Sequence, residues 1–543
     1  MYLAQDKYLR FFRYAYKVDP TIQQKNIALS RKVEQSPHDV EAWLALIDYQ
    51  DIVLRAGDER HRTTNAEIKS TAEIKIHMYE KAIEKAQSLE NRERLLLGLM
   101  AEGAKIWESK AQSERWEQIS NDNIDSLLLW TSYLNFKQSN FPTFRYEEIK
   151  LVYLSRIKLL TRAINNADPT PADQIYHQLV YVLLRLTLFI RESGYSELAI
   201  AIWQGILEVN FFGPKQQMTR DDTINLFKEF WESEVLRIGE DGALGWQRYV
   251  ENEASSMVPG SIVDAEDNSL DNENIFKSWC KAERIRSECT LPARTMDEVV
   301  EDDPFRVIIF SDIEDFLPCL PSGAEKLRTL CIDAYLLFCG LPIMSTGITE
   351  PRKWSQDAFV RNELLQRDIS SMERLPKAQI EDESAETNCQ SNLKLDFSNY
   401  PRSPDTMFSS NRWFHDSSLV ERYSQYNGPV PYKWVQTVLK QLAQSHRSEE
   451  LAEYFLGFQS INEPETIKKI AKSILKQYPS NLRLYNAYAM IEWSRNKDIA
   501  KGVFTAALNM RYGTNGVSSN DTILLWKSWI WCCLGDGDKD SVC

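Results

Sequence analysis

The side chains of this sequence most able to do chemistry are carboxylates concentrated between residues 297 and 315, flanking an apolar, β-prone run at 307–310. They are Asp297, Glu298, Glu301, Asp302, Asp303, Asp312, Glu314 and Asp315. A calcium loop would space its oxygen ligands around a turn-forming glycine, and this block lacks that pattern. We interpret it as solvated acidic loops, with a metal site and a docking surface for a basic partner segment as alternatives. The docking residues would be Asp302, Asp303, Asp312 and Asp315.

The remaining sequence does not assemble a catalytic set. It contains no P-loop, no G-x-G-x-x-G, no H-E-x-x-H and no G-x-S-x-G. Glu232 and Glu492 could serve acid–base chemistry, but a glutamate on a repeat helix more often accepts a hydrogen bond from a neighbouring tyrosine. We therefore expect no enzyme, no cofactor and no metal. The six histidines are scattered, at His38, His61, His77, His177, His415 and His446.

The cysteine pattern and the hydropathy of the sequence indicate the cellular compartment in which the protein works. The nine cysteines are odd in number and form no C-x-x-C pair, which favours reduced thiols in the cytosol or nucleus. The longest apolar stretch, residues 179–190, is shorter than the ~20 residues needed to span a bilayer. The first residues lack the basic and apolar regions of a signal peptide, so we expect neither secretion nor a membrane anchor.

The charge pattern is compatible with RNA binding only at local segments of the surface. A net charge of −14 argues against a surface that binds nucleic acid over its whole area. Residues 6–32 nevertheless interleave seven basic residues with aromatic ones, and residues 145–162 carry five basic residues against two acidic ones. Such segments could bind RNA by stacking and phosphate neutralisation. A solvated helix face is the commoner explanation, and we prefer it.

The elements that position these residues are best seen in residues 481–510. The second half of this stretch carries apolar residues at i, i+3, i+4, i+7 and i+8, which predicts an amphipathic helix. A cap at Asn481 and a link at 495–497 too short for any other arrangement predict an antiparallel helical hairpin. One hairpin cannot bury its own apolar face, so it requires neighbours.

Similar units recur along the 543 residues, a length that exceeds what one compact core holds. We therefore predict an all-α fold, an α-solenoid of stacked antiparallel helical hairpins. Large aromatic residues near helix centres are expected to fill the space between hairpins. The repeat-defining residues are Trp43, Tyr79, Trp130, Tyr133, Trp203, Trp231, Trp246, Trp279, Tyr485, Tyr488, Glu492, Ala500, Phe504, Leu508, Trp526 and Trp529.

The order of these residues resembles a known repeat and a known family. Tyr485, Tyr488 and Glu492, followed by Ala500 and Phe504, resemble the HAT (half-a-TPR) repeat. Three longer blocks in order resemble the NRDE family, whose name abbreviates nuclear RNAi defective and which is described as necessary for RNA interference. The blocks are Asp39-Val40-Glu41-Ala42-Trp43, Ala199 to Phe212 with Phe230-Trp231-Glu232-Ser233-Glu234, and Glu301-Asp302-Asp303-Pro304-Phe305 with the residues to Ile313.

The resemblance implies a nuclear, non-catalytic scaffold in RNA interference, heterochromatin formation, RNA surveillance or pre-mRNA splicing. It also implies an exosome-associated RNA helicase and spliceosomal proteins as partners. Two alternatives stay open. One is a HAT subunit of another particle, for splicing, 3′-end processing or ribosome biogenesis, which dimerises through its later repeats. The other is a protein that binds RNA directly.

We expect four regions. Residues 1–35 form basic aromatic helices, 36–345 a first repeat array, 346–430 an irregular linker or excursion, and 431–543 a second array. Trp413 and Phe414 are expected to dock the irregular region onto the solenoid. The last predicted helix, from Thr522 to Cys533, is apolar and lacks a polar cap, which favours an array that is truncated here or covered by another chain. Family members resembling this chain carry further repeats at that point and a long disordered region before the first repeat.

Overall fold

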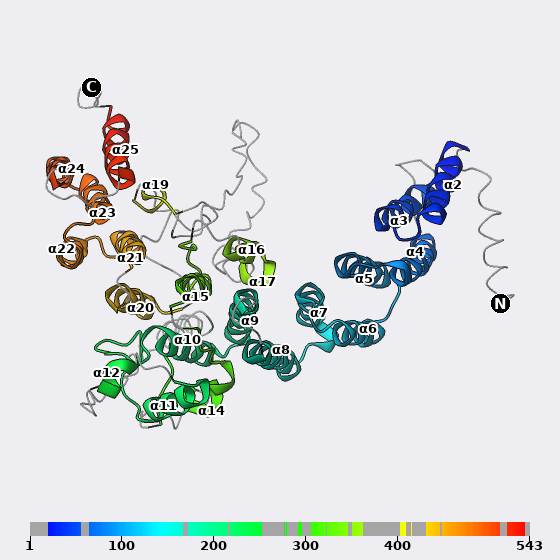
Figure 1. Ribbon diagram of the computed structural model, residues 1–543, viewed down its shortest axis with the longest axis horizontal. Helices are drawn as coiled ribbons and strands as arrows, with labels where there is room; N and C mark the ends of the chain where they lie inside the picture. Colours follow the sequence, from blue (N-terminus) through cyan, green and yellow to red (C-terminus); the bar gives the residue numbers. More distant parts are fainter. Residues whose placement is uncertain are drawn as a thin grey trace. The chain divides into compact units, whose positions relative to one another are not determined.

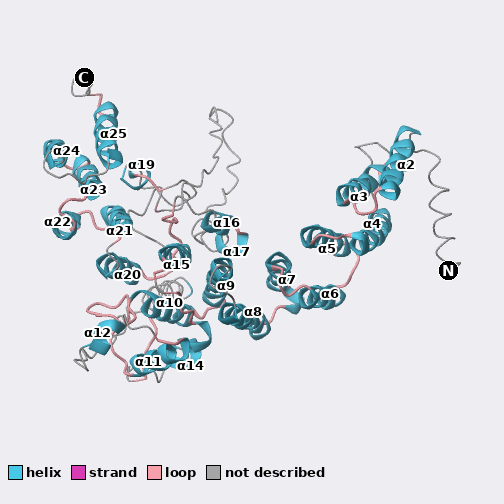
Figure 2. Ribbon diagram, viewed as in Figure 1, coloured by secondary structure: helices cyan, strands magenta, loops and turns pink. Residues whose placement is uncertain are grey.

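The structure is a computed structural model that describes part of the chain. The described residues are 20–55, 64–166, 172–214, 218–251, 276, 279, 291–295, 306–321, 323–345, 350–361, 402–408, 414, 430–445, 448–510 and 519–537. Within them the regular structure is helical, and an isolated bridge joins Ala293 to Val307 (Figures 1 and 2). The chain divides into two compact units, Met1–Val152 and Tyr153–Cys543. No helix within these ranges combines the length and apolarity needed to cross a membrane.

The first unit consists of helices that pack in the order of the sequence. They are α2 (Pro20–Gln35), α3 (Val40–Leu54), α4 (Asn65–Lys85), α5 (Leu89–Gly103), α6 (Ser109–Asp122), α7 (Leu127–Ser139), the 3-10 turn η2 (Phe141–Thr143) and the start of α8 (Tyr146–Asn166). Each helix from α2 to α6 packs against the next one in sequence. Leu95, Leu99 and Tyr79 lie in the shared core of α3, α4 and α5.

Polar residues define where these helices begin. The Asp39 side chain accepts a hydrogen bond from the Ala42 N–H at 3.3 Å, and Ser126 accepts one from the Leu129 N–H at 3.1 Å. Thr64 and Glu67 form a reciprocal capping box at the start of α4. These bonds satisfy N–H groups that have no partner inside the helix, so the sequence sets the breaks between hairpins locally.

The second unit contains the remaining helices. They are the rest of α8, α9 (Ala172–Glu192), α10 (Ser196–Phe211), α11 (Arg220–Glu232), α12 (Trp246–Glu251), α14 (Phe310–Ile313), η5 (Glu314–Phe316), α15 (Glu325–Phe338), α16 (Glu350–Gln356), α17 (Ala358–Arg361), α19 (Pro404–Phe408), α20 (Tyr432–Ser445), α21 (Glu449–Asn462), α22 (Ile467–Gln477), α23 (Leu482–Trp493), α24 (Lys497–Met510) and α25 (Ser519–Gly535).

Helix α9 departs from the simple amphipathic pattern. All twelve residues from 179 to 190 are buried, because α10, α15 and α17 each pack against this helix. α15 follows α9 by more than a hundred residues in the sequence, so its packing is long-range. Figure 1 shows α15 beside α9 and α10. The long apolar stretch noted in the sequence is therefore a buried core helix.

The C-terminal helices return to sequential pairing. The hairpin predicted at 481–510 is α23 followed by α24, and α25 packs on both. Phe504 of α24 stacks on Trp529 of α25 with ring centroids 5.5 Å apart. Helix pairs packed in sequence in both units confirm the prediction of an all-α repeat fold of stacked hairpins.

Candidate functional site

Most of the repeat-defining residues lie inside the helix stack. Buried positions are Tyr79, Trp130, Tyr133, Trp203, Trp231, Trp246, Tyr488, Glu492, Ala500 and Phe504, and partly buried ones are Trp43, Tyr485, Leu508 and Trp529. Trp203 is representative, because its indole N–H donates to Thr187 Oγ1 at 3.0 Å while its ring meets Tyr335 and Phe338. These residues hold helices together. Trp279 and Trp526 are 52% and 48% exposed.

The acidic block divides between local roles and residues outside the described part. Asp312 Oδ2 accepts a hydrogen bond from the Ile309 N–H at 3.0 Å and so caps α14. Asp315 forms an exposed ion pair with Lys158 at 3.1 Å. Asp302 and Asp303 lie outside the described residues. In the ranges that can be searched, no three His, Cys, Asp or Glu side chains gather as a metal site would require.

The basic segments are only partly available at the surface. Residues 6–19 lie outside the described ranges. On α8, Arg156 is buried and its guanidinium lies 3.5 Å from Gln178 Oε1, and Lys158 is engaged by Asp315. Arg145 and Arg162 are exposed. Part of the positive charge predicted on this helix therefore serves packing.

A buried glutamate forms a first polar centre, which joins α10 to the loop after α11. Glu208 is fully buried, and its two carboxylate oxygens accept hydrogen bonds from the N–H groups of Ile238 (2.8 Å) and Trp246 (2.9 Å). Burial raises the pKa of Glu208 to about 7, although both hydrogen bonds oppose that shift. Gln204, one turn earlier, donates to the Ile238 carbonyl at 3.0 Å. Helix α10 therefore binds both the backbone N–H and the backbone carbonyl of Ile238.

The same loop continues the connection to α20. Gln441 accepts a hydrogen bond from the Gly239 N–H at 2.8 Å and donates to the Glu240 carbonyl at 3.2 Å. Gly239 has φ +88°, and a Cβ there would lie 2.3 Å from Trp434 Nε1. The loop thus requires glycine at this position, because a side chain would be strained and would collide with α20.

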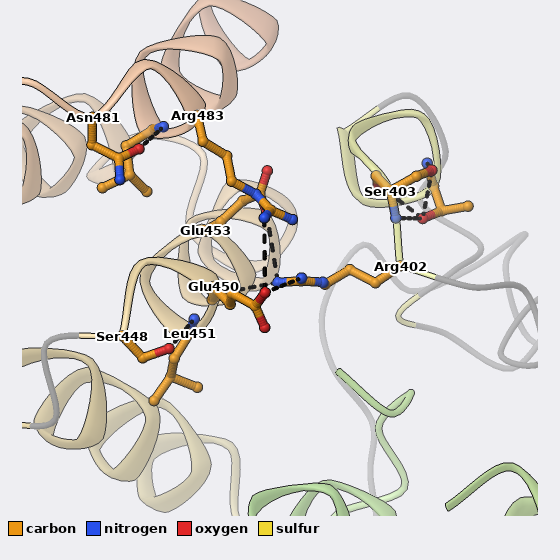
Figure 3. Close-up of polar contacts among 10 residues, drawn as sticks. Arg402, Ser403, Ser448, Glu450, Leu451, Glu453, Asn481 and Arg483 are labelled. Atoms are coloured by element: carbon orange, nitrogen blue, oxygen red, sulfur yellow. Dashed lines mark hydrogen bonds and ion pairs between the residues drawn. The ribbon is translucent and has the colours of Figure 1, made fainter. Parts of the chain in front are cut away.

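A second polar centre holds residues 402–408 against α21 and α23 (Figure 3). The Arg402 guanidinium donates to the Glu450 carbonyl at 3.2 Å and forms ion pairs with the carboxylates of Glu450 (3.3 Å) and Glu453 (3.6 Å). Arg483 of α23 donates to the same Glu453 carboxylate at 2.7 Å. The side chains of Arg402 and Glu453 are 3% and 0% exposed, so this pair is desolvated, whereas Arg483 and Glu450 remain partly in contact with solvent.

The electrostatics of this Arg402 cluster follow from that burial. Desolvation raises the pKa of Glu453, opposed by Arg483 and Arg402. Desolvation, together with the like charge of Arg483, lowers the pKa of Arg402. A buried ion pair is worth little in net stability, but removing one partner leaves the other uncompensated and is strongly destabilising.

Apolar contacts extend the attachment of this segment. Met407 is fully buried, and Phe414 packs edge-on to Tyr454 at 5.3 Å and to Phe458 at 6.0 Å. Phe414 therefore docks on the repeat helices as predicted, while Trp413 lies outside the described residues. The partners Arg402 and Met407 were missed from the sequence. Two features of the sequence point to this contact: the basic residue ahead of Ser403-Pro404 and the regularly placed acids of α21.

The last described helix presents a different kind of surface. Five large apolar residues of α25 are exposed: Ile523, Trp526, Ile530, Trp531 and Leu534. Most of them share one side of the helix, because they recur at intervals of three and four residues. The opposite side, with Leu525 and Trp529, packs on α23 and α24.

Sequentially packed helix pairs, with polar clusters that hold distant segments of the chain in place, define an α-helical repeat protein. Sequence comparison places the chain more narrowly: it belongs to the NRDE-2 family, described as "NRDE-2, necessary for RNA interference", whose model matches residues 24–344. This confirms the family resemblance noted in the sequence.

Curated relatives extend the similarity beyond the matched region. Protein NRDE2 homolog of Schizosaccharomyces pombe is 24% identical over 569 aligned positions, covering 94% of this chain and 54% of the relative. Nuclear exosome regulator NRDE2 of Homo sapiens is 25% identical over 520 positions, covering 89% of this chain and 42% of the relative. A protein with the same name in Dictyostelium discoideum is 25% identical over 41% of this chain. The chain thus spans about half the length of the yeast and human relatives.

Proposed function

We propose that this chain is a non-catalytic scaffold that acts in the nucleus, in RNA processing linked to the nuclear exosome. The observation that carries the proposal is family membership, joined to a human relative named nuclear exosome regulator that aligns over 89% of this chain. The processes concerned are RNA surveillance, RNA interference, heterochromatin formation or pre-mRNA splicing. Because the chain covers only part of each relative, their activity is extended to it here as a proposal.

The architecture suits a protein that holds partners. Stacked helix pairs bury one face against their neighbours and leave their outer faces available along the array, so binding can be spread over many modest contacts. Ion pairs with a buried cation help to fix the helices in one arrangement: Lys75, 3% exposed, pairs with Asp51 at 2.6 Å, and Arg185, 1% exposed, pairs with Asp357 at 2.8 Å. A surface that is already ordered loses less entropy on binding.

The organisation into basic N-terminal helices, two repeat arrays and a linker remains part of this proposal, with the repeat-defining aromatics setting the spacing of the stack. The partners we propose are an exosome-associated RNA helicase and spliceosomal proteins. Asp312 and Asp315, with Asp302 and Asp303, are the proposed docking residues for a basic partner segment.

Crosslinking mass spectrometry on the tagged chain purified from nuclei tests this function. We expect crosslinks from exposed lysines, such as Lys469, Lys472 and Lys476 of α22, to RNA-processing proteins. An unrelated helical-repeat protein with the same tag, expressed at the same level, is the control. A chain that stays in the cytoplasm and captures no RNA-processing factor contradicts the proposal, whereas capture of a different particle alone favours the alternative HAT-subunit role.

Direct RNA binding is a second candidate, favoured by the exposed Arg162 on α8 and the exposed Arg145 just before this helix. Fluorescence anisotropy with labelled single-stranded RNA tests it. Binding through phosphate contacts should weaken steeply between about 50 and 200 mM salt, because counterions are released on association. No saturable binding at the lower salt concentration removes this candidate.

A further inference from the structure

Residues 402–408 and Phe414 contact the repeat helices in the manner of a bound peptide. The described part of this segment is residues 402–408 and Phe414, and it includes the short helix α19. In the sequence, residues 362–401 separate it from α17 and residues 415–429 separate it from Val430. Its contacts in space are made to α21, α23 and α25, which follow it along the chain.

We propose that α21, α23 and α25 form a peptide-docking surface, occupied in this chain by residues 402–408 and Phe414, and that its external ligand is a partner segment with the same pattern. That pattern is an arginine, a buried methionine five positions later and a phenylalanine twelve positions later. The proposal goes beyond the nuclear scaffold role and does not depend on it.

Charge complementarity provides the first anchor. Without the segment, the surface presents the carboxylates of Glu450 and Glu453 with Arg483 beside them, an excess of one negative charge. Arg402 compensates that charge and adds a hydrogen bond to a backbone carbonyl of α21. The planar guanidinium can contact both carboxylates and the carbonyl at once, whereas a lysine ammonium lacks this forked geometry. The surface is therefore selective for arginine.

An apolar recess without a side chain of its own provides the second anchor. A Cβ at Gly457 would lie 3.2 Å from the Met407 Cβ and 3.2 Å from the Phe414 ring, so the absence of a side chain there admits both residues. Tyr454 and Phe458 border the recess and meet Phe414 edge-on. Phe408 also packs on the core shared by α23, α24 and α25. These contacts select an aliphatic and an aromatic residue at fixed spacing.

An exposed ion pair at the edge of the docking surface favours one orientation of the bound segment. Asp405 pairs with Lys527 of α25 at 2.7 Å, and both side chains are substantially exposed, at 33% and 55%. Such a pair adds little affinity but penalises the wrong register. Covalent attachment gives a docked segment an effective concentration on the order of mM, so an external segment competes when it binds well enough or is abundant.

A peptide-binding experiment on the whole chain tests the proposal. In an emptied variant, residues 402–414 are replaced by the same number of Gly and Ser residues, and the probe is a fluorescein-labelled peptide of residues 399–417. We expect saturable binding by anisotropy to the emptied variant, and at least tenfold weaker binding to the intact chain. Peptides with Arg402→Glu or Met407→Asp should lose at least tenfold. Absence of binding to an emptied variant that keeps the circular dichroism of the intact chain overturns the proposal.

A second measurement serves where the emptied variant does not fold. Protease sites are inserted after residues 395 and 420, and the folded chain is then cleaved and diluted. If the segment is a docked ligand, the excised fragment should separate from the repeat helices on size-exclusion chromatography, and the rest of the chain should keep its helical circular dichroism. If the fragment is released only with unfolding of the array, the segment is an integral part of the core and the proposal fails.

Charge exchange at the rim tests the register. The Asp405→Lys peptide should bind the emptied variant several-fold more weakly, and the emptied variant that also carries Lys527→Asp should recover that binding. Lys472→Asp, at an exposed position of α22, is the matched control and should not restore it. Equal recovery with both lysine variants would indicate unspecific attraction and contradict the assigned contact.

Discussion

At the scale of single residues, the polar groups with the strongest structural role are those buried inside otherwise apolar helices. Glu208 lies in α10 among residues that are almost all buried. It accepts hydrogen bonds from the backbone N–H groups of Ile238, in the loop after α11, and of Trp246, the first residue of α12. An acid in the middle of an apolar run is a signal that the sequence contains, but its partners, about 30 and 38 residues away, cannot be read from periodicity.

Glu208 predicts a pH dependence of stability. The native state holds a proton on this carboxyl up to about pH 7, while the unfolded chain releases it near its ordinary pKa of about 4.3. Between these values the unfolded state binds fewer protons, so the free energy of unfolding falls as pH rises, by at most about 1.4 kcal/mol per pH unit from this group. Glu208→Gln should remove that slope, measured by urea unfolding at pH 5, 6 and 7.

A matched control exists for this experiment. Asp333 is also buried, with its pKa raised to about 6 by desolvation, and it accepts hydrogen bonds from Met344 N–H and Ser345 N–H at 2.7 and 3.2 Å. Asp333→Asn should change the slope mainly between about pH 4 and 6, and its effect between pH 6 and 7 should be smaller than that of Glu208→Gln. A Glu208→Gln variant with the slope of the unsubstituted chain contradicts the assignment.

Trp203 and Trp526 allow the packing role of the repeat aromatics to be measured. Trp203→Phe removes the indole N–H that donates to Thr187 and leaves a void among buried rings, so we expect a loss of about 1–3 kcal/mol in unfolding free energy. Trp526→Phe, at a residue 48% exposed, should cost less than about 0.5 kcal/mol. Chemical denaturation followed by circular dichroism compares the two, and similar losses would contradict the buried role of Trp203.

At the scale of elements, the helices were predictable where their burial is one-sided. The stripe of α24 and the caps at Asn481 and Asp39 are local, so the sequence alone locates those hairpins. α9 is buried through twelve successive residues, which removes the stripe on which such predictions depend. The attachment of α19 by Arg402 joins residues 48 positions apart or more, so the sequence shows the basic residue and the acids of α21 but not that they pair.

Two glycines predict opposite responses to alanine. Gly239 has φ +88° and faces Trp434, so Gly239→Ala should destabilise the protein by more than about 1 kcal/mol. Gly502 lies inside α24, and apart from the backbone of this helix no atom of the described residues lies within 4 Å of the place that an alanine methyl group would occupy. Gly502→Ala should therefore stabilise the protein by about 0.5–1 kcal/mol. Thermal melts of the two variants give the signs, and the same sign for both would refute this account of the loop.

At the scale of the whole molecule, repeat architecture predicts that a destabilising substitution affects only the helices near it. Leu95 is fully buried in the core of α3, α4 and α5, and Leu95→Ala should cost about 2–5 kcal/mol there. Each repeat contacts mainly its neighbours, so hydrogen exchange should increase in α3 to α5 and stay unchanged in α23 and α24. A uniform increase over both units would show cooperative unfolding of the whole chain instead.

The polar link between the loop at Gly239 and Gln441 joins positions 202 residues apart along the chain. α10 and α20 are therefore neighbours through this loop, and ring contact between Tyr335 and Trp434 adds α15 to the same junction. The chain between these helices can become longer or shorter in evolution with little loss of stability, because the entropic free energy of closing a loop grows only with the logarithm of its length. Insertions and deletions among homologues should accordingly accumulate at positions 252–290 and 362–401, leaving the residues of the junction in register.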